Sequence, residues 1–308
     1  MPEATSKALK YVRESKKRAP SRLLHFTDAH GVAGILGQQV LWLARARAST
    51  DSSELRYGLG IAKDCLEALS RKDDWFRTFK EEVTNGWDGV PFFDVVRPIP
   101  EPHIFCFAVA TPRNEKSIAH WSMYGSSGSG MVLVFDGHSL ARKEKVDLVR
   151  VVYEPAQQRA MMTTLLRAGL DACIAGRIRA SRFGPTVAEH MFRTLCRAVA
   201  SLAAIVAAAM KAPQFSIEDE WRFVVSYIPV QLSAEEQKDQ LPLLVRASGT
   251  TLKSYFQLPI TPKDLKGVVL GPGASELNEP VIKMLLDDKG YLKTTEVRIG
   301  TTPLRART

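Results

Sequence analysis

Two glutamates, Glu218 and Glu220, lie two residues apart, directly before a run of apolar residues at 223–225. The aromatic and β-branched residues around them predict a strand over 215–227. Side chains two residues apart in a strand point to the same face, about 7 Å from each other. Two carboxylates on one face repel each other, and such a pair is suited to general acid–base chemistry or to stabilising a developing positive charge. The alternative is a solvated strand end at which Arg222 forms an ion pair with a carboxylate.

Two other short clusters place polar or aromatic side chains within apolar sequence. Residues 23–27 read Leu-Leu-His-Phe-Thr, and residues 120–125 read His-Trp-Ser-Met-Tyr-Gly. Each cluster has an ordinary structural interpretation. His25 is then a core histidine with its hydrogen bonds satisfied, and Trp121 and Tyr124, three residues apart, pack on one face of a helix.

In this order, and with the apolar run at 267–272, the clusters resemble a bacterial family known as a domain of unknown function, number twenty-nine seventy-one. The resemblance extends from about residue 23 to residue 305, and its most specific parts are the Trp-x-x-Tyr-Gly and Glu-x-Glu-Trp-Arg clusters. The chain departs from the family at residues 50–54, where Thr-Asp-Ser-Ser-Glu stands in place of an Asn-Asp-Pro-x-Glu turn. This departure leaves the role of that loop open.

The order of His25, Tyr124 and Glu220 also resembles the His-Tyr-Glu triad in the NAD-binding core of mono-ADP-ribosyltransferases. In that superfamily the histidine holds the adenosine ribose, and the tyrosine stacks on the nicotinamide ring. The glutamate binds a hydroxyl of the nicotinamide ribose and stabilises the oxocarbenium ion that forms as nicotinamide leaves. The resemblance implies that NAD is the substrate and that Glu220 is catalytic, with Glu218 orienting the acceptor.

The residue types suit these roles, because a developing cation needs a fixed anion, a flat ring needs an aromatic platform, and neutral imidazole both donates and accepts hydrogen bonds. Thr27 has the alternative role of capping the helix that follows it. The residues expected to bind NAD are Arg22, His25, Phe26, Thr27, Trp121 and Tyr124.

The four cysteines, at positions 65, 106, 173 and 196, form no Cys-x-x-Cys pair, and no histidine lies at zinc-finger spacing from them. We therefore expect neither a structural metal nor a disulfide, and reduced, buried cysteines are typical of a cytoplasmic protein.

The chain carries a formal net charge of +9, which favours nucleic acid as a partner. Much of this charge lies in the arm formed by residues 1–20, at the C-terminus, and at Arg177, Arg179 and Arg182. These arginines do not alternate with aromatic residues as they would on a surface that stacks bases. A solvated basic surface is the alternative to nucleic-acid binding.

No apolar run is long and uncharged enough to predict a membrane span, and the nearest, residues 198–210, is alanine-rich and short. The basic arm is followed by no apolar segment of the kind found in secretion signals. A membrane is therefore not an expected partner.

Strands interrupted by helices of unequal length predict an α+β protein with a split, mostly antiparallel sheet and surrounding helices. A single domain is expected over residues 21–308, after the arm, with a helical insert at about 156–211. The expected helices cover residues 31–37, 54–70, 74–83, 156–175, 187–210 and 276–286. The expected strands cover residues 23–27, 41–43, 104–109, 131–135, 146–153, 215–227, 268–270 and 297–299.

Three classes of function follow from these observations. The first is transfer of ADP-ribose from NAD to a protein, a nucleic acid or a small molecule, or hydrolysis of NAD, in a bacterial toxin or phage-defence protein. The second is a non-catalytic module that senses or binds a nucleotide. The third is a nucleic-acid-binding or nuclease domain, whose candidate metal ligands are scattered through the sequence.

Overall fold

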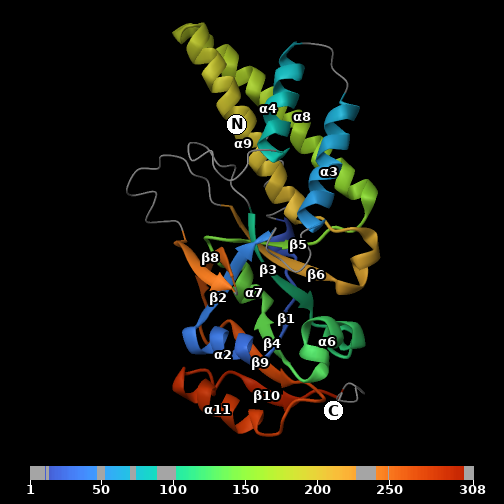
Figure 1. Ribbon diagram of the computed structural model, residues 1–308, viewed down its shortest axis with the longest axis vertical. Coiled ribbons are helices and arrows are strands. Elements are labelled where there is room, and N and C mark those ends of the chain that lie inside the picture. Colours follow the sequence, from blue (N-terminus) through green and yellow to red (C-terminus); the bar gives the residue numbers. More distant parts are fainter. Residues whose placement is uncertain are drawn as a thin grey trace.

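The computed structural model describes residue 11 and residues 14–46, 53–69, 74–88, 102–226, 241–248 and 250–301 of the 308. In these residues one open, mostly antiparallel sheet is surrounded by helices, as expected for the α+β class. Figure 1 shows the long helices at the top and the sheet with its shorter helices below them.

The strands follow one another in the order β10-β9-β4-β1-β3-β2-β8-β7, and β6 pairs with both β3 and β5 away from this path. Among the described strands, β9 and β10 form the one parallel pair. The strands are β1 (Arg22–Thr27), β2 (Val40–Arg45), β3 (Pro102–Val109), β4 (Met131–Asp136), β5 (Asp147–Arg150), β6 (Glu220–Ser226), β7 (Leu243–Ser248), β8 (Thr251–Pro259), β9 (Leu265–Leu270) and β10 (Glu296–Ile299).

The sheet is split at the middle of β3. Strand β6 pairs with β3 along residues 102–108, whereas β1 and β2 share the opposite edge. Leu24 of β1 pairs with Ala108 near one end of β3, and Ala44 of β2 pairs with Ile104 near the other. The two strands therefore diverge between residues 104 and 108, and side chains can enter the sheet there.

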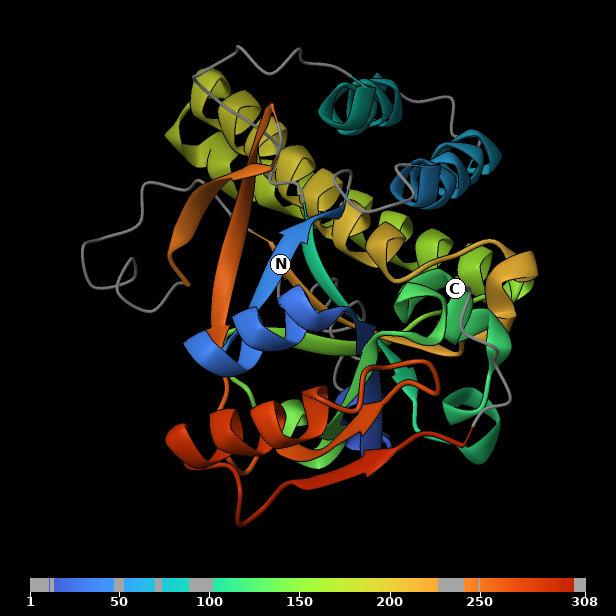
Figure 2. The same ribbon diagram turned by 60° about the horizontal axis from the view of Figure 1, so that its bottom comes forward.

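The helical insert consists of α8 (Pro155–Ala180) and α9 (Pro185–Ala208), which separate β5 from β6 in sequence. A Cβ atom at Gly169 would lie 2.8 Å from Val199 Cγ1, so the absence of a side chain there lets α8 approach α9 closely. Helices α3 (Ser53–Ala68) and α4 (Asp74–Asp88) complete a bundle around α9. Figure 2 shows α8 and α9 running side by side above the sheet.

Helix α9 is long and apolar enough to cross a membrane by length and composition, but 61 % of the apolar window is buried. Its buried residues pack against α3, α4 and α8. The expectation that no apolar run is long enough to span a membrane is therefore wrong by length and composition, whereas the burial agrees with the expectation of a buried helix for residues 198–210.

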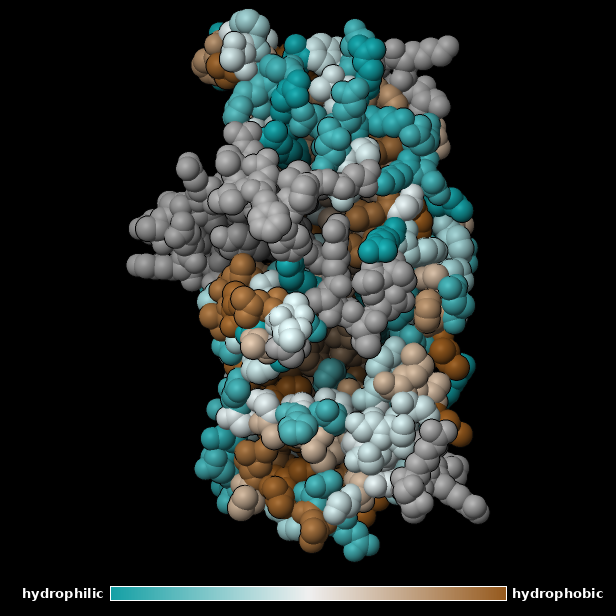
Figure 3. All heavy atoms as spheres, in the orientation of Figure 1, coloured by the Kyte–Doolittle hydropathy of each residue, from teal (hydrophilic) through white to brown (hydrophobic). Residues whose placement is uncertain are grey.

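Two shorter helices, α2 (Ala29–Gln38) and α11 (Asn278–Asp288), pack with a second apolar cluster that includes Phe105 and Phe223. One face of α11 is exposed at Leu277, Val281 and Met284. Figure 3 shows hydrophobic residues gathered at this lower end of the molecule.

The main helices and strands lie close to their predicted positions, but the strand expected over residues 215–227 is wrong in its first part. Residues Pro213–Glu218 form a 3-10 helix, η4, and Asp219 adopts a left-handed conformation with φ 43°. Strand β6 begins at Glu220, and Tyr227 lies outside the described residues. Strands β7 and β8 were not expected.

The N-terminal arm expected over residues 1–20 is described in part. Lys16 Nζ donates a hydrogen bond to the carbonyl oxygen of Val146 (2.9 Å), and Ala19 is buried. The last residues of the arm therefore pack against the sheet.

Candidate functional site

A cavity of about 250 Å³ opens beside the split in the sheet. Its walls come from β1, β3, β6 and helix α6 (Ile118–Tyr124), with further residues from the start of α3, the end of η4 and the segment after α9. Five residues expected to form the NAD site line this cavity, although they are far apart in the sequence: His25, Phe26, Tyr124, Glu218 and Glu220.

Three other expected NAD-binding residues do not line the cavity. Trp121 is 0 % exposed and donates from Nε1 to the carbonyl oxygen of Glu115 (2.8 Å), so it serves the core as a packing residue. Thr27 pairs with Met131 at the end of β1, and Asp28 rather than Thr27 caps α2. Arg22 is exposed at the other end of β1.

His25 lies where the backbone pairing between β1 and β3 ends. Its Nδ1 lies 3.0 Å from the carbonyl oxygen of Cys106. A carbonyl only accepts, so Nδ1 carries the proton and Nε2 of the neutral ring is an acceptor. Burial lowers the pKa of His25 to about 4, against the smaller opposing effect of this hydrogen bond.

The depressed pKa of His25 predicts a loss of stability in acid. The unfolded chain takes up a proton near pH 6.5 and the folded chain near pH 4, so this contribution to stability is complete above pH 6.5 and is lost as the pH falls towards 4. At about 1.4 kcal/mol per pKa unit, the loss is on the order of 3 kcal/mol. The check is the free energy of urea unfolding between pH 4 and 8, compared with His25→Asn, whose amide can donate to Cys106 without titrating. Parallel curves for the two proteins would contradict the assignment.

Tyr124 ends α6 and connects the aromatic side of the cavity to its acidic side. Its hydroxyl donates to Glu218 Oε1 at 3.1 Å. Burial and the charge of Glu218 raise the pKa of Tyr124 well above its usual value, so the phenol stays protonated. Tyr124 is 37 % exposed as a whole residue and lines the cavity.

Three carboxylates and two cations meet in the cavity wall. Lys211 Nζ lies 2.7 Å from Glu54, contacts Glu218 closely, and lies 3.5 Å from Glu220. Arg222 binds both oxygens of Glu220, with Nε–Oε1 and Nη2–Oε2 distances of 2.8 Å, and its Nη2 lies 2.5 Å from Glu54 Oε2. The formal charge of the network is therefore −1, from three carboxylates and two cations.

The ion pairs outweigh desolvation at each end of this network. Burial alone would raise the pKa of Glu220, but Arg222 and Lys211 hold it below its usual value. Burial alone would lower the pKa of Lys211, but the carboxylates raise it, and the same balance raises that of Arg222. All three groups therefore stay ionised at neutral pH.

Glu218 and Glu220 meet in the cavity by a different route from the one expected. Glu218 ends η4, and the left-handed turn at Asp219 separates it from β6. The position of the Glu218 side chain therefore does not follow from the alternation of side chains along a strand. A strand through both residues would leave Glu218 further than Glu220 from the apolar residues at 223–225, but the structure buries the two glutamates to a similar degree, with 7 % and 6 % exposure. Arg222 forms ion pairs with Glu220 and Glu54, as the structural alternative predicted, but the pairs are buried and do not lie at a solvated strand end.

Glu54, Lys211 and His120 were not expected in the site. Glu54 is the last residue of the segment that departs from the family pattern, and it lies in the first turn of α3. Lys211 lies three residues after the end of α9 and in no recognisable motif. His120 precedes the Trp-x-x-Tyr-Gly cluster, which was the one indication of its position.

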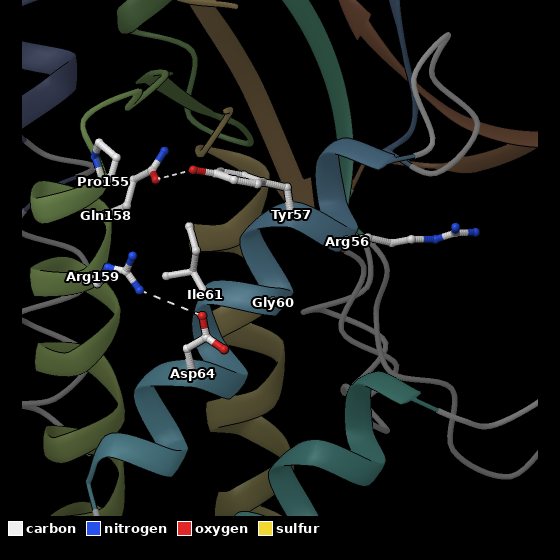
Figure 4. Close-up of a pocket in the computed structure, with 8 residues that line it drawn as sticks. All are labelled: Arg56, Tyr57, Gly60, Ile61, Asp64, Pro155, Gln158 and Arg159. Atoms are coloured by element: carbon white, nitrogen blue, oxygen red, sulfur yellow. Dashed lines mark hydrogen bonds and ion pairs between the residues drawn. The ribbon is translucent and has the colours of Figure 1, made fainter. Parts of the chain in front are cut away.

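A second cavity, of about 310 Å³, lies between α3 and the start of α8. In Figure 4, Tyr57 points towards Gln158 while Arg56 points away from the cavity. The Tyr57 hydroxyl donates to Gln158 Oε1 (2.9 Å), and Gln158 Nε2 donates to the carbonyl oxygen of Lys211 (2.8 Å). Tyr57 and Gln158 therefore hold the backbone of Lys211, whose side chain lines the first cavity.

Within the described ranges, no group of three or more His, Cys, Asp or Glu side chains is arranged to hold a metal ion. All four cysteines are free, and Cys106 lies beside the ion-pair network at the cavity. Burial and the charge of Glu220 raise the pKa of the Cys106 thiol, which makes it a poor nucleophile.

No curated protein and no solved structure matches the chain. One family does match part of it, and the matched segment contains both the Trp-x-x-Tyr-Gly and the Glu-x-Glu-Trp-Arg clusters. The resemblance to this family is therefore confirmed over that segment: residues 120–223 match the family described as "Protein of unknown function (DUF2971)".

Proposed function

We propose that this protein acts on NAD, transferring ADP-ribose to an acceptor or to water. The observation that carries the proposal is the convergence of His25, Tyr124, Glu218 and Glu220 at one cavity beside a split sheet. These are the residue types that the resemblance to ADP-ribosyltransferases assigns to ribose binding, ring stacking and cation stabilisation.

In the proposed reaction the bond between C1′ of the ribose and the nicotinamide nitrogen breaks, and the electron pair leaves with neutral nicotinamide. The ribose becomes an oxocarbenium ion, which a fixed carboxylate stabilises. Water or an acceptor hydroxyl or amine then forms a bond to C1′ and loses its proton. Glu220 is proposed to stabilise the cation, and Glu218 to receive the proton or orient the acceptor.

The charge and size of the cavity favour one end of NAD. A volume of about 250 Å³ is below the range of about 300–1,000 Å³ that holds a drug-sized ligand, so only part of a dinucleotide fits inside. Lys211 and Arg222 are both committed to carboxylates, and the net charge of the network is negative. The cationic nicotinamide riboside end suits this cavity, so His25 is proposed to contact the nicotinamide ribose and not the adenosine ribose that the resemblance implies. The phosphates are expected to lie outside the cavity.

A non-catalytic nucleotide-binding module is the second candidate, and one observation favours it. Arg222 occupies both oxygens of Glu220, which reduces the negative charge available to a developing cation. A site of this kind can bind the ligand without cleaving it.

Purified protein separates the two candidates. Thermal unfolding with and without NAD measures binding, since a ligand that binds the folded state raises the midpoint. Chromatography of the same mixture measures free nicotinamide. The transferase is supported if the midpoint rises and nicotinamide appears, the binding module if only the midpoint rises, and neither if NAD changes nothing. We place the activity in the cytoplasm, where NAD is available and cysteines stay reduced.

A further inference from the structure

His120 lines the cavity and carries a buried ring nitrogen that has no hydrogen-bond partner. The residue is 3 % exposed, and the unpaired nitrogen is Nδ1. A buried polar atom without a partner costs about 1–3 kcal/mol, and buried polar atoms are almost always paired in folded proteins. A hydrogen bond between Nδ1 and a ligand that enters the cavity would explain why Nδ1 has no partner within the protein.

The other contacts of His120 determine which kind of group this is. Its Nε2 lies 3.2 Å from the carbonyl oxygen of Glu218, so Nε2 must carry the proton. Burial lowers the pKa of His120 despite the nearby carboxylates, so the ring is neutral at physiological pH. Nδ1 is then an acceptor and requires a donor.

The ring is held in place on both sides. Phe26 packs against it with a centroid distance of 5.2 Å, and Tyr124 lies 6.4 Å away. The backbone N–H of His120 donates to Ser117 Oγ at the start of α6 (3.3 Å). A donor must therefore come to Nδ1, because the ring has little freedom to turn towards one.

The charges around the cavity exclude an anionic partner for His120. Glu54, Glu218 and Glu220 outnumber Lys211 and Arg222, and the esterified pyrophosphate of a dinucleotide carries no proton to donate at neutral pH. An uncharged hydroxyl satisfies both the acceptor and the negative surroundings.

We infer that His120 Nδ1 accepts a hydrogen bond from a ribose hydroxyl of the bound ligand and is a binding residue of this cavity. His25 Nε2 is a second neutral acceptor in the same cavity, so the two histidines together suit a sugar with neighbouring hydroxyls. The inference rests on the proposed function in taking the ligand to be a ribosyl compound, but it requires no cleavage.

Two substitutions test the roles of the two ring nitrogens of His120 separately. In His120→Gln the side-chain amide reaches the position of Nε2 and can donate to Glu218, but the acceptor at Nδ1 is lost. In His120→Asn the amide oxygen lies near the position of Nδ1, whereas the contact to Glu218 is lost. Calorimetric titration with ADP-ribose is expected to show about tenfold weaker binding for His120→Gln, and nearly parental binding for His120→Asn once its fraction folded is taken into account.

The parent protein offers a second measurement that does not depend on either variant folding. Histidine labelled with ¹⁵N reports the tautomer of each ring, and the Nδ1 signal of His120 is expected to move when ADP-ribose is added. A signal that stays unchanged at saturating ADP-ribose, or a His120→Gln protein that binds as the parent does, would overturn the assignment and leave a water molecule as the partner of Nδ1.

The results of these experiments also show whether the role of His120 and the proposed transferase activity stand or fail independently of each other. If ADP-ribose moves the Nδ1 signal but NAD releases no nicotinamide, the role of His120 stands and the transferase proposal fails. If His120→Gln releases nicotinamide with the parent's KM, the transferase proposal stands and the role of His120 is overturned. If the parent binds neither NAD nor ADP-ribose at millimolar concentration, both are overturned.

Discussion

Replacing Arg222 with alanine is expected to lower the free energy of unfolding by about 3–5 kcal/mol, because removing one partner of a buried ion pair leaves the other charge uncompensated. Arg222 is 2 % exposed and contacts Glu220 through two hydrogen bonds and Glu54 through a third. Its Nη1 also donates to the carbonyl oxygen of Ala208 at the end of α9 (2.8 Å). The substitution therefore disturbs the junction of α3, α9 and β6 together, and urea unfolding at pH 7 measures the loss.

Arg150→Ala is the matched control for this prediction. Arg150 lies on β5 beside β6, and its guanidinium is exposed and lies 3.5 Å from Asp219. An exposed pair of this kind contributes about 0–1 kcal/mol, so the control is expected to unfold almost as the parent does. An Arg222→Ala protein with the parent's urea midpoint but without NAD binding would mean that Arg222 contacts the ligand and is not a structural residue.

Glu220→Gln is expected to reduce nicotinamide release from NAD by about 10²–10³-fold, by analogy with the loss of one preorganised group that stabilises transition-state charge. The glutamine keeps the shape of the side chain, but only its amide oxygen can accept from Arg222, so one of the two hydrogen bonds is lost and the rate is measured on protein shown to be folded. The loss should appear in kcat more than in KM, because the developing cation exists only in the transition state.

Glu218→Gln is the matched substitution on the other side of Lys211. Its amide can still accept from Tyr124, and it is expected to spare cleavage of NAD by water while reducing transfer to an acceptor. Equal loss of cleavage in both variants would show that the division of roles between the two glutamates is wrong. Initial rates for both variants and the parent, measured in one experiment, decide this.

Much of the fold was predictable because the spacing of apolar residues indicates which segments form helices and which form strands. The apolar positions of α3 recur at helical spacing, and the short apolar runs at 104–109 and 131–135 lie on central strands. Strands β7 and β8 alternate only weakly, with exposed Val245 and Leu252 among polar residues, so their pattern resembles that of a loop.

The start of β6 shows where local patterns stop being informative. Phe215 and Ile217 have strand-forming side chains, yet residues 213–218 form a 3-10 helix that begins with a proline. The left-handed conformation of Asp219 then turns the chain into the sheet. A two-residue spacing could predict that the glutamates lie near each other, but not the path that brings them together.

The cations of the site were harder to predict than its histidine, tyrosine and glutamates. Lys211 reaches Glu54 and Glu218 because α9 ends beside α3 and η4, which depends on packing between helices distant in sequence. Gly58 on α3 allows this, since a Cβ atom there would lie 2.6 Å from the Ala207 carbonyl oxygen. Such tertiary contacts have no signature in a single sequence.

The most direct test of the central claim is a single-turnover reaction with protein in excess over NAD, followed by measurement of free nicotinamide. Excess protein makes even a slow cleavage visible and removes any dependence on product release. The parent is expected to convert the NAD to nicotinamide and an ADP-ribosyl product, and Glu220→Gln is expected to leave it intact over the same time. Intact NAD after prolonged incubation with the folded parent, or conversion by Glu220→Gln at the parent's rate, would contradict the account.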